Sequence, residues 1–423
     1  MKKKLLSTFI IGLITLGLQG QSLNWELSVP PNARNVYDVK FVSGNKIFVF
    51  GGNQSNDSIS TIAKTEDAGL NWKVLKDRPN MPLLKDAHIL EEKTIIVVGE
   101  AGEVLRSIDT GKTFTKISLP KSVNNRKLNS VYFTNATHGF IAGGNPSNDA
   151  ITTLLESKDA GATWSIIKDG LGPMLNDVYF YDKDNGIAVG NNGLVMKTAD
   201  AGATWTTVTI SGNAGTRTLN SVHFATNSKG FIVGGHPSND SIQTILKTTD
   251  GGASWSTEKD NVNPMLQDVY FHTASIGMIV GNNGAVLETK DGGDNWTSVT
   301  LPGVNDKWFF TSVHYLNDSN AIIGGLQGAV FIANAPFKDN TNIGLSPAIS
   351  NTLLFPNPAK NEFEIKGDLN NIKQVEVIDN MGKKVHFSIK NNRVNIETLS
   401  SGVYHVVVGL ESGETLLKKL IIE

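Results

Sequence analysis

A short sequence pattern recurs six times in this chain, and it limits the possible folds more than any other feature. Each copy begins with Ser or Thr, has Asp two residues later and Gly two residues after that, and ends in Trp or Phe. Successive aspartates are separated by 42, 50, 41, 50 and 41 residues, so long and short units alternate. An internal period of this length indicates an array of similar supersecondary units. The six aspartates are Asp67, Asp109, Asp159, Asp200, Asp250 and Asp291.

The stretch from 177 to 208 shows the structure expected of each unit. "DVYFYD" predicts a strand with alternating faces and "GIAVG" a short buried strand, and "GLVMKTAD" and "ATWTTV" predict two more strands. Four short antiparallel strands in a unit of this length are typical of a β-propeller blade. A leucine-rich or helical repeat would need segments with helical periodicity, and we find none in the sequence.

The repeated pattern itself has a structural explanation. We expect the Asp carboxylate to accept backbone N–H bonds within its own turn, the Gly to adopt positive φ, and the Ser or Thr hydroxyl to add a local bond. The aromatic residue at the end is large enough to pack between neighbouring blades. The pattern resembles the Asp-box (BNR) repeat. We interpret the six aspartates as structural, because a catalytic residue would not be needed six times.

A seventh unit follows the six boxes, but it is incomplete. Residues 311–337 contain three predicted strands and neither a box nor a fourth strand. The missing strand is present at the other end of the chain, in "LNWELSV", where Trp25 corresponds to Trp72 and Trp296 of the box-containing units. Pairing of this N-terminal segment with the last unit would leave no free sheet edge. The sequence therefore predicts an all-β fold, a seven-bladed β-propeller closed by its N-terminal strand.

The strand sequences outside the boxes carry a family resemblance. Phrases such as "LNDVYFYDKDNGIAVGNNGLVMKTADAGATW" (175–205) resemble the propeller family of photosystem II stability and assembly factors, and the resemblance covers residues 22–337. It implies a non-enzymatic scaffold that binds another protein. It does not imply photosynthesis, because the C-terminal sequence points to a different kind of cell.

The two ends of the chain predict export. Residues 1–20 have three lysines, an apolar run and small or polar residues, which is the layout of a signal peptide, and we expect cleavage after Gly20. The apolar run is too short for a good membrane span, so we expect no transmembrane segment in the mature chain. We expect the propeller to occupy residues 21–337, and the polar residues 338–350 to form a linker.

Residues 351–423 predict a small β-sandwich, because short alternating strands fill the segment. Its landmarks are "FPNPAKNEFEIKG", "VEVIDNMGKKV", "LSSGVYHVVV" and the terminal "KKLIIE". In this order they resemble the type A sorting domain of the type IX secretion system of Bacteroidetes. The resemblance implies that the domain engages the type IX secretion machinery. It also implies a secreted protein located outside the cell or at the outer-membrane surface.

Composition removes several classes of function. With 38 Lys and Arg against 40 Asp and Glu, the chain has no basic excess to attract nucleic acid. It has no cysteine, and its eight histidines are scattered, so we expect no metal site. No phosphate-binding glycine loop precedes a helix, so we expect no nucleotide and no other cofactor.

Candidate ligand-binding residues come from the longer units. Three similar insertions, at 51–61, 143–153 and 234–244, fall between the second and third strands, on the face opposite the boxes. An arginine precedes the first strand of each longer unit, and Trp308 has the matching place in the seventh. Guanidinium groups and an indole around a channel mouth would suit carboxylates or sugar rings. Alternatively, each arginine pairs with an aspartate of a neighbouring loop and only makes that loop rigid. The candidates are Arg34, Arg126, Arg217, Trp308, Asn56, Asp57, Asn148, Asp149, Asn239 and Asp240.

The shorter units carry a different carboxylate at the start of their first strands, namely Asp86, Asp177 and Asp268. Paired carboxylates would suit glycoside hydrolysis, whereas a cap on a tight loop is the structural alternative that we favour. We assign no catalytic residue and expect a secreted or cell-surface binding or scaffold protein that recognises a protein or glycan ligand through the face with the insertions. Two alternatives stay open: a polysaccharide-degrading hydrolase resembling sialidases or xyloglucanases, and an envelope assembly factor.

Overall fold

The structure is a computed structural model of the chain. It describes residues 23–30, 34–53, 59–79, 81–145, 150–236 and 238–333, and then 353–355, 359–366, 372–379, 385, 387–390, 393–410 and 415–422. The predicted signal peptide and linker lie outside these residues. The chain divides into two compact units, Met1–Pro336 and Phe337–Glu423. No helix within the described ranges is both long and apolar enough to cross a membrane.

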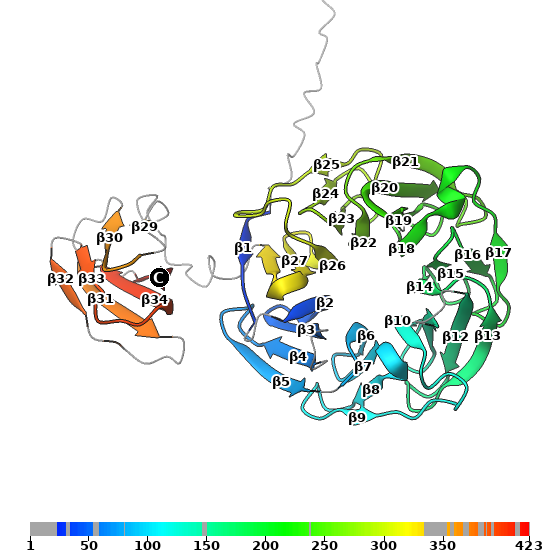
Figure 1. The fold of residues 1–423 in the computed structure, drawn as a ribbon, viewed down its shortest axis with the longest axis horizontal. Coiled ribbons are helices and arrows are strands. Elements are labelled where there is room, and N and C mark those ends of the chain that lie inside the picture. Colours follow the sequence, from blue (N-terminus) through cyan, green and yellow to red (C-terminus); the bar gives the residue numbers. More distant parts are fainter. Residues whose placement is uncertain are drawn as a thin grey trace, which may run out of the picture. The chain divides into compact units, whose positions relative to one another are not determined.

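Seven four-stranded antiparallel sheets form the first unit, and Figure 1 shows them arranged as a ring around a central channel. Within blades 1 to 6 the strands follow chain order from the centre outward. Blade 1 contains β2 (Asn35–Ser43), β3 (Lys46–Asn53), β4 (Ile59–Thr65) and β5 (Trp72–Arg78). Blade 2 contains β6 (Leu84–Leu90), β7 (Thr94–Gly99), β8 (Val104–Ser107) and β9 (Thr115–Lys116). Blade 3 contains β10 (Lys127–Phe133), β11 (Gly139–Gly144), β12 (Ile151–Ser157) and β13 (Ser165–Leu171).

The next three blades repeat this arrangement. Blade 4 contains β14 (Leu175–Phe180), β15 (Gly186–Gly190), β16 (Val195–Thr198) and β17 (Thr206–Val208). Blade 5 contains β18 (Thr218–Phe224), β19 (Gly230–His236), β20 (Asn239–Thr248) and β21 (Ser256–Val262). Blade 6 contains β22 (Leu266–Phe271), β23 (Gly277–Gly281), β24 (Val286–Thr289) and β25 (Thr297–Ser298). Short 3-10 turns, η2 (Glu100–Gly102), η3 (Asn213–Thr216) and η4 (Leu326–Gly328), lie in the connections.

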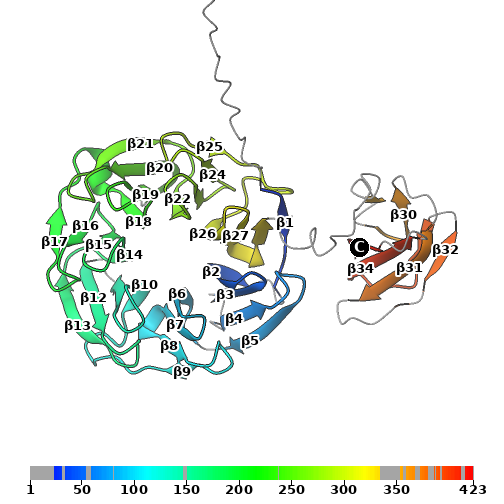
Figure 2. The same cartoon turned by 180° about the vertical axis from the view of Figure 1, so that it is seen from behind.

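Blade 7 is completed by the N-terminal strand, as the sequence predicts. It contains β26 (Phe310–Asn317), β27 (Asn320–Gly325) and β28 (Val330–Ala333), and β1 (Trp25–Leu27) pairs antiparallel with β28. Trp25 lies opposite Ala333, just as Trp72 lies opposite Thr65 in blade 1. The reverse view in Figure 2 shows β1 on the outside of the ring beside blade 7.

The propeller has two ends that differ in their loops. We call the end at which each first strand begins the insert face, because the longer loops between second and third strands open there. The opposite end, which carries the Asp boxes, is the box face. The fourth strand of blades 1, 3 and 5 is seven residues long, whereas β9, β17 and β25 of the even blades have two or three.

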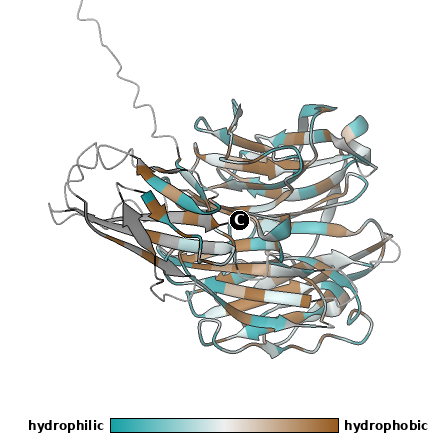
Figure 3. Cartoon of the chain, turned by 60° about the vertical axis from the view of Figure 1, so that its left-hand side comes forward, coloured by the Kyte–Doolittle hydropathy of each residue, from teal (hydrophilic) through white to brown (hydrophobic). Residues whose placement is uncertain are grey.

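Apolar side chains between neighbouring sheets form the core, and Figure 3 shows hydrophobic stretches running along the strands. Phe140 of blade 3 and Phe180 of blade 4 stack with their ring centroids 4.7 Å apart. Trp205, from the fourth Asp box, makes T-shaped contacts with both rings. The aromatic residue of the box therefore packs between blades, as its size predicts.

The six boxes share one hydrogen-bond pattern, which the first box illustrates. The Thr65 hydroxyl donates to the Asp67 carboxylate at 2.6 Å and accepts the Gly69 N–H at 2.9 Å. The Asn71 N–H donates to Asp67 at 2.8 Å. Gly69 has φ 90°, as predicted, but Ala68 before it also has positive φ, at 54°, which the sequence analysis did not anticipate. In the last two boxes Gly251 and Gly292 occupy the position of Ala68, where glycine adopts positive φ without steric cost.

The second unit is a small β-sandwich. One sheet contains β29 (Leu353–Phe355), β30 (Glu362–Lys366), β33 (Arg393–Asn395) and β32 (Ser388–Lys390). The other contains β31 (Ile372–Asp379), β34 (Gly402–Leu410) and β35 (Thr415–Ile422). Side chains from both sheets, among them Phe363, Val377 and Val406, form one buried cluster. The all-β fold predicted from the sequence is confirmed for both units.

Candidate functional site

The central channel is a polar cavity of about 470 Å³, lined by the first strands of all seven blades. Successive side chains of a strand point to opposite faces, so alternate residues of each first strand face the channel and the others enter the core. A register shift near the start of each first strand, such as the one between Leu128 and Ser130, lets two consecutive residues line the channel there. The side chains that line it form three layers. A carboxamide-rich layer lies nearest the insert face, a layer of aspartate and serine follows, and a mostly aromatic layer lies toward the box face.

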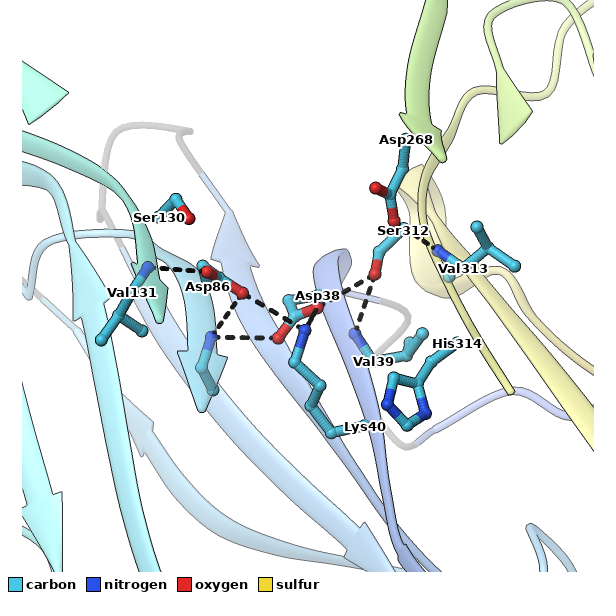
Figure 4. A network of polar contacts seen from close by, with 12 residues as sticks. Asp38, Val39, Lys40, Asp86, Ser130, Val131, Asp268, Ser312, Val313 and His314 are labelled. Atoms are coloured by element: carbon cyan, nitrogen blue, oxygen red, sulfur yellow. Dashed lines mark hydrogen bonds and ion pairs between the residues drawn. The ribbon is translucent and has the colours of Figure 1, made fainter. Parts of the chain in front are cut away.

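The middle layer joins every blade to the next. Asp86 accepts the N–H of Val131 at 2.8 Å, and Ser130 in turn donates to Asp177 of the following blade at 2.7 Å. Each aspartate accepts a backbone N–H from the following blade, and each serine donates to the next aspartate. The result is a closed circuit of hydrogen bonds, part of which Figure 4 shows. Its members, in blade order, are Asp38, Asp86, Ser130, Asp177, Ser221, Asp268 and Ser312.

This circuit corrects the prediction for the even-blade aspartates. Asp86, Asp177 and Asp268 do not cap tight loops; they connect blades through bonds to residues about one repeat further along the chain. Their carboxylate oxygens are therefore occupied by backbone N–H groups, together with a serine hydroxyl at Asp177 and Asp268 and the Lys40 ammonium at Asp86. The aligned Asp and Ser of the first strands were visible in the sequence, but their bonding to the next blade was not recognised.

One junction of the circuit differs from the others. Asp38 and Asp86 are neighbours without a serine between them, and Lys40 lies against both. Its Nζ is 2.8 Å from Asp38 Oδ1 and 3.3 Å from Asp86 Oδ1 (Figure 4). Burial acts to lower the pKa of Lys40, but the carboxylates of Asp38 and Asp86 raise it overall. Lys40 therefore carries a positive charge at the only junction between two aspartates.

Burial also changes the acidity of the carboxyl groups. It raises the pKa of Asp38 to about 7, although Lys40 acts in the opposite direction. It raises the pKa of Asp177 to about 7, against the bond from the Val222 N–H. The pKa of Asp268 is raised for the same reason. Carboxyls with raised pKa often mark functional sites, but structural networks produce the same shift.

The layer toward the box face is a collar of rings in edge-to-face and tilted contact. His88, Tyr132, Tyr179, His223, Tyr270 and His314 come from blades 2 to 7, and neighbouring centroids are 4.3 to 5.2 Å apart. Lys40 has the corresponding position in blade 1. Burial lowers the pKa of His88 to about 4 and of His223 to about 3, so these rings are neutral at pH 7.

Carboxamides line the mouth at the insert face. Asn129 donates to the carbonyl of Leu175 at 2.8 Å, and Asn220 repeats this bond to Leu266 at 2.7 Å. On the blade 1 and 2 side, the Lys85 ammonium lies 3.8 Å from the centroid of the Tyr37 ring and 3.5 Å from Glu100. Burial lowers the pKa of Lys85 to about 8.

The predicted arginines do not line this mouth. Arg126 makes two bonds to Asp169 of β13, at 3.0 and 2.9 Å, and Arg217 binds Asp260 of β21 in the same way. Arg34 lies 3.6 Å from Asp77 of β5. A threonine of the third strand donates to each of these aspartates. The arrangement agrees with the alternative in which each arginine pairs with an aspartate, although the partner lies on the fourth strand and not in a loop.

Trp308 occupies the equivalent position in blade 7, but it packs inward. Its ring meets Phe331 edge to face, with the centroids 5.5 Å apart. The equivalence is clear from the backbone, because the carbonyls of Arg126, Arg217 and Trp308 each accept an N–H from a glycine of the preceding blade at 2.7 Å. Trp308 is half-buried and does not line the channel.

The inserted loops are only partly described. Asn56, Asp57, Asn148 and Asp149 lie outside the described residues, as does the side chain of Asp240. Asn239 is exposed at the start of β20. The structure thus brings three arginine–aspartate pairs to equivalent places on the insert face and leaves the contribution of the loops as a prediction.

Two exposed apolar residues lie close in sequence to the aspartates of the pairs in blades 3 and 5. Leu171 ends β13 and Val262 ends β21, each two residues after the aspartate that binds the arginine, and their exposed fractions are 87% and 78%. Each lies opposite a half-buried isoleucine, Ile151 or Ile242. Neither residue is among the candidates predicted from the sequence, although their shared distance from the aspartates is visible in the repeat.

Two families match separate parts of the chain. Residues 353–423 match the family described as secretion system C-terminal sorting domain. Residues 156–260 and 253–349 match the family described as photosynthesis system II assembly factor YCF48. The chain therefore combines a propeller resembling these assembly factors with a C-terminal sorting domain of the type IX system, as the sequence predicts. The sorting domain indicates secretion or export to the cell surface.

Curated relatives match a shorter segment. The photosystem II stability/assembly factor HCF136 of Arabidopsis thaliana is 29% identical over 117 residues, which are 25% of this chain and 26% of that protein. The photosystem II assembly lipoprotein Ycf48 of Synechococcus sp. (strain CC9902) is 33% identical over 121 residues, 27% of this chain and 33% of that protein. The matches thus span about a quarter to a third of these relatives.

Solved structures share the fold over longer stretches. A structure described as YCF48 bound to D1 peptide is 16% identical, with a TM-score of 0.55, and covers 73% of this chain and 96% of that one. PorZ, described as a bacterial surface component of the type-IX secretion system of Porphyromonas gingivalis, is 12% identical, with a TM-score of 0.53, over 94% of this chain and 60% of that one. At these identities the similarity concerns the fold alone.

Proposed function

We propose that this chain is a secreted binding protein whose propeller holds another protein through the insert face of blades 3 and 5. The observation that carries the proposal is the exposure of Leu171 and Val262 at equivalent positions of that face. Burial of exposed aliphatic side chains by a partner is favourable, whereas sugar rings pack better on exposed aromatic faces. A protein surface or an extended peptide therefore fits this face better than a glycan.

The arginines have a supporting role in this proposal. The side chains of Arg217 and Asp260 are each only 10% exposed, and their two parallel bonds fix the end of β21 relative to the first strand of the blade. Such a bidentate pair holds both groups in one geometry. Val262 is thereby presented on a rigid edge, which lowers the entropy lost when a partner binds. The adjacent inserted loops, including Asn239, would extend the contact.

The comparisons support a partner-binding function by analogy of fold. One structure with this fold is described as bound to a peptide, and another as a surface component of a secretion system. An envelope assembly factor would be one form of the proposed function. The hydrolase alternative gains no support, because the carboxylates of Asp86, Asp177 and Asp268 are engaged between blades.

The test is a comparison of matched surface variants. The full chain, its L171S/V262S double variant and an I166S control would be used for crosslinking and capture on intact cells of the native organism. Ile166 is a suitable control because it is 40% exposed in the same strand, nearer the box face. We expect a partner that the wild type and I166S retain and the double variant loses, with unchanged melting temperatures. Equal retention by all three would contradict the proposal.

Two further expectations belong to this function. N-terminal sequencing of the exported protein should give Gln21 as its first residue, in agreement with cleavage after Gly20. Incubation with host and plant glycans should release no reducing ends. Release of sugars would favour the hydrolase alternative and count against a function in binding alone.

A further inference from the structure

We propose that Lys40 is the residue that allows an odd number of blades to close the hydrogen-bonded circuit of aspartates and serines. Around most of the channel the circuit alternates, with a serine of one blade donating to the aspartate of the next. Seven members cannot alternate throughout, so one junction must join two residues of the same kind. In this chain that junction joins Asp38 and Asp86.

The chemistry of this junction differs from that of two adjacent serines. An ionised carboxylate accepts hydrogen bonds but donates none, so two neighbouring aspartates have no proton to share between them. Two negative charges in a partly buried channel also repel each other. At three of the other junctions a serine hydroxyl lies within 3.0 Å of the aspartate and supplies the donor. At the remaining three the aspartate accepts a backbone N–H from the following blade.

Lys40 supplies the missing hydrogen-bond donor and offsets the repulsion between the two carboxylates. Its ammonium donates to Asp38 at 2.8 Å and to Asp86 at 3.3 Å, so it replaces the absent hydroxyl and offsets the two charges. Its backbone position is equivalent to the ring-bearing positions of the six other blades. A lysine has replaced an aromatic ring or histidine only in the blade where the alternation fails.

The position of the junction gives the interaction a further role. Asp38 also accepts the hydroxyl of Ser312 at 3.0 Å, a bond between residues 274 positions apart that joins blade 7 to blade 1. Lys40 therefore holds in place the Asp38 carboxylate, which connects the first strand of blade 1 with the first strand of blade 7. The same carboxylate accepts the N–H of Ala87 in blade 2 at 3.0 Å.

A set of variants in the full chain tests this inference. All seven tryptophans precede the second unit, so tryptophan fluorescence reports unfolding of the propeller alone. Replacement of Lys40 by Met keeps the length of the side chain and removes the charge. At pH 8 we expect K40M to lower the Tm by roughly 5 °C or more, because it leaves the buried carboxylate of Asp38 and the partly buried carboxylate of Asp86 without their cation.

The decisive comparison is between two second-site changes. D86N removes one charge and places an amide donor beside Asp38, so K40M/D86N should recover most of the lost Tm. D177N removes an equivalent charge from a junction that already has a serine, so K40M/D177N should recover little. If K40M does not fold, the same contrast is measured as the soluble yield of the two double variants. The proposal is overturned if K40M melts like the wild type, or if D177N restores stability as well as D86N does.

Discussion

Trp25 offers the sharpest test of ring closure, because its indole is the main apolar contact of a strand only three residues long. Its side chain is 8% exposed and belongs to a buried cluster that includes Met278 and Val280 of blade 6 and Phe331 of blade 7. Truncation of a buried tryptophan to alanine costs about 3–5 kcal/mol. For a propeller of this size, about 2 °C of Tm per kcal/mol gives an expected loss of about 6–10 °C for W25A.

A conservative variant separates packing from polarity. The indole Nε1 of Trp25 is buried without a hydrogen-bond partner, and an unpaired buried donor costs about 1–3 kcal/mol. W25F keeps most of the packing and removes this donor, so the two effects should nearly cancel. We therefore expect W25F to melt within about 2 °C of the wild type, in contrast to W25A.

Calorimetry, together with limited proteolysis, is the appropriate assay. If W25A frees β1, the protease should cut near residue 28 and leave the rest of the propeller open at β28. Cleavage should be slow in the wild type and in W25F. The reasoning is refuted if W25A keeps the melting temperature of the wild type, or if W25F is as unstable as W25A.

Two further predictions follow from the channel and the blade connections. The pKa of Asp38 and of Asp177 is about 7 in the folded state, above the value of about 3.9 in the unfolded state. The folded state therefore binds protons more tightly than the unfolded state does. The resulting stabilisation is fully present below pH 4 and is lost as the pH rises through 7. Urea unfolding should therefore give a free energy at least about 1 kcal/mol lower at pH 8 than at pH 5, and a higher value at pH 8 would contradict the assignment. Gly193 has φ 64°, and a Cβ there would lie 2.5 Å from the carbonyl carbon of Gly215, so G193A should lower the unfolding free energy by about 1–3 kcal/mol. Gly170 has no atom within 4 Å of such a Cβ, and G170A is the control, expected to change the stability little in the same denaturation experiment.

The sequence predicted the features that depend on local pattern. The boxes recur with their Ser or Thr, Asp and Gly in fixed positions, so the turn geometry around Asp67 follows from neighbouring residues. The closing strand was also predictable, because Trp25 keeps the spacing of a blade's last strand although its blade lies at the far end of the chain. Repetition made a contact between distant segments visible in one sequence.

The contacts between blades were harder to predict. Ser130 bonds to Asp177, 47 residues away, and each partner taken alone fits an ordinary turn or strand residue. The arginines illustrate the same difficulty. The position of Arg126 before a first strand predicts a place at the channel mouth. Asp169 on the outermost strand of the same blade, however, provides two acceptors and holds the guanidinium away from the channel.

The pairing of β1 with β28 sets an order of events during folding. β1 has no strand to pair with until more than 300 later residues are available, since Trp25 pairs with Ala333. Until then its strand edge is open to association with other chains. The contact that closes the propeller is therefore the last of its strand pairings that the growing chain makes possible.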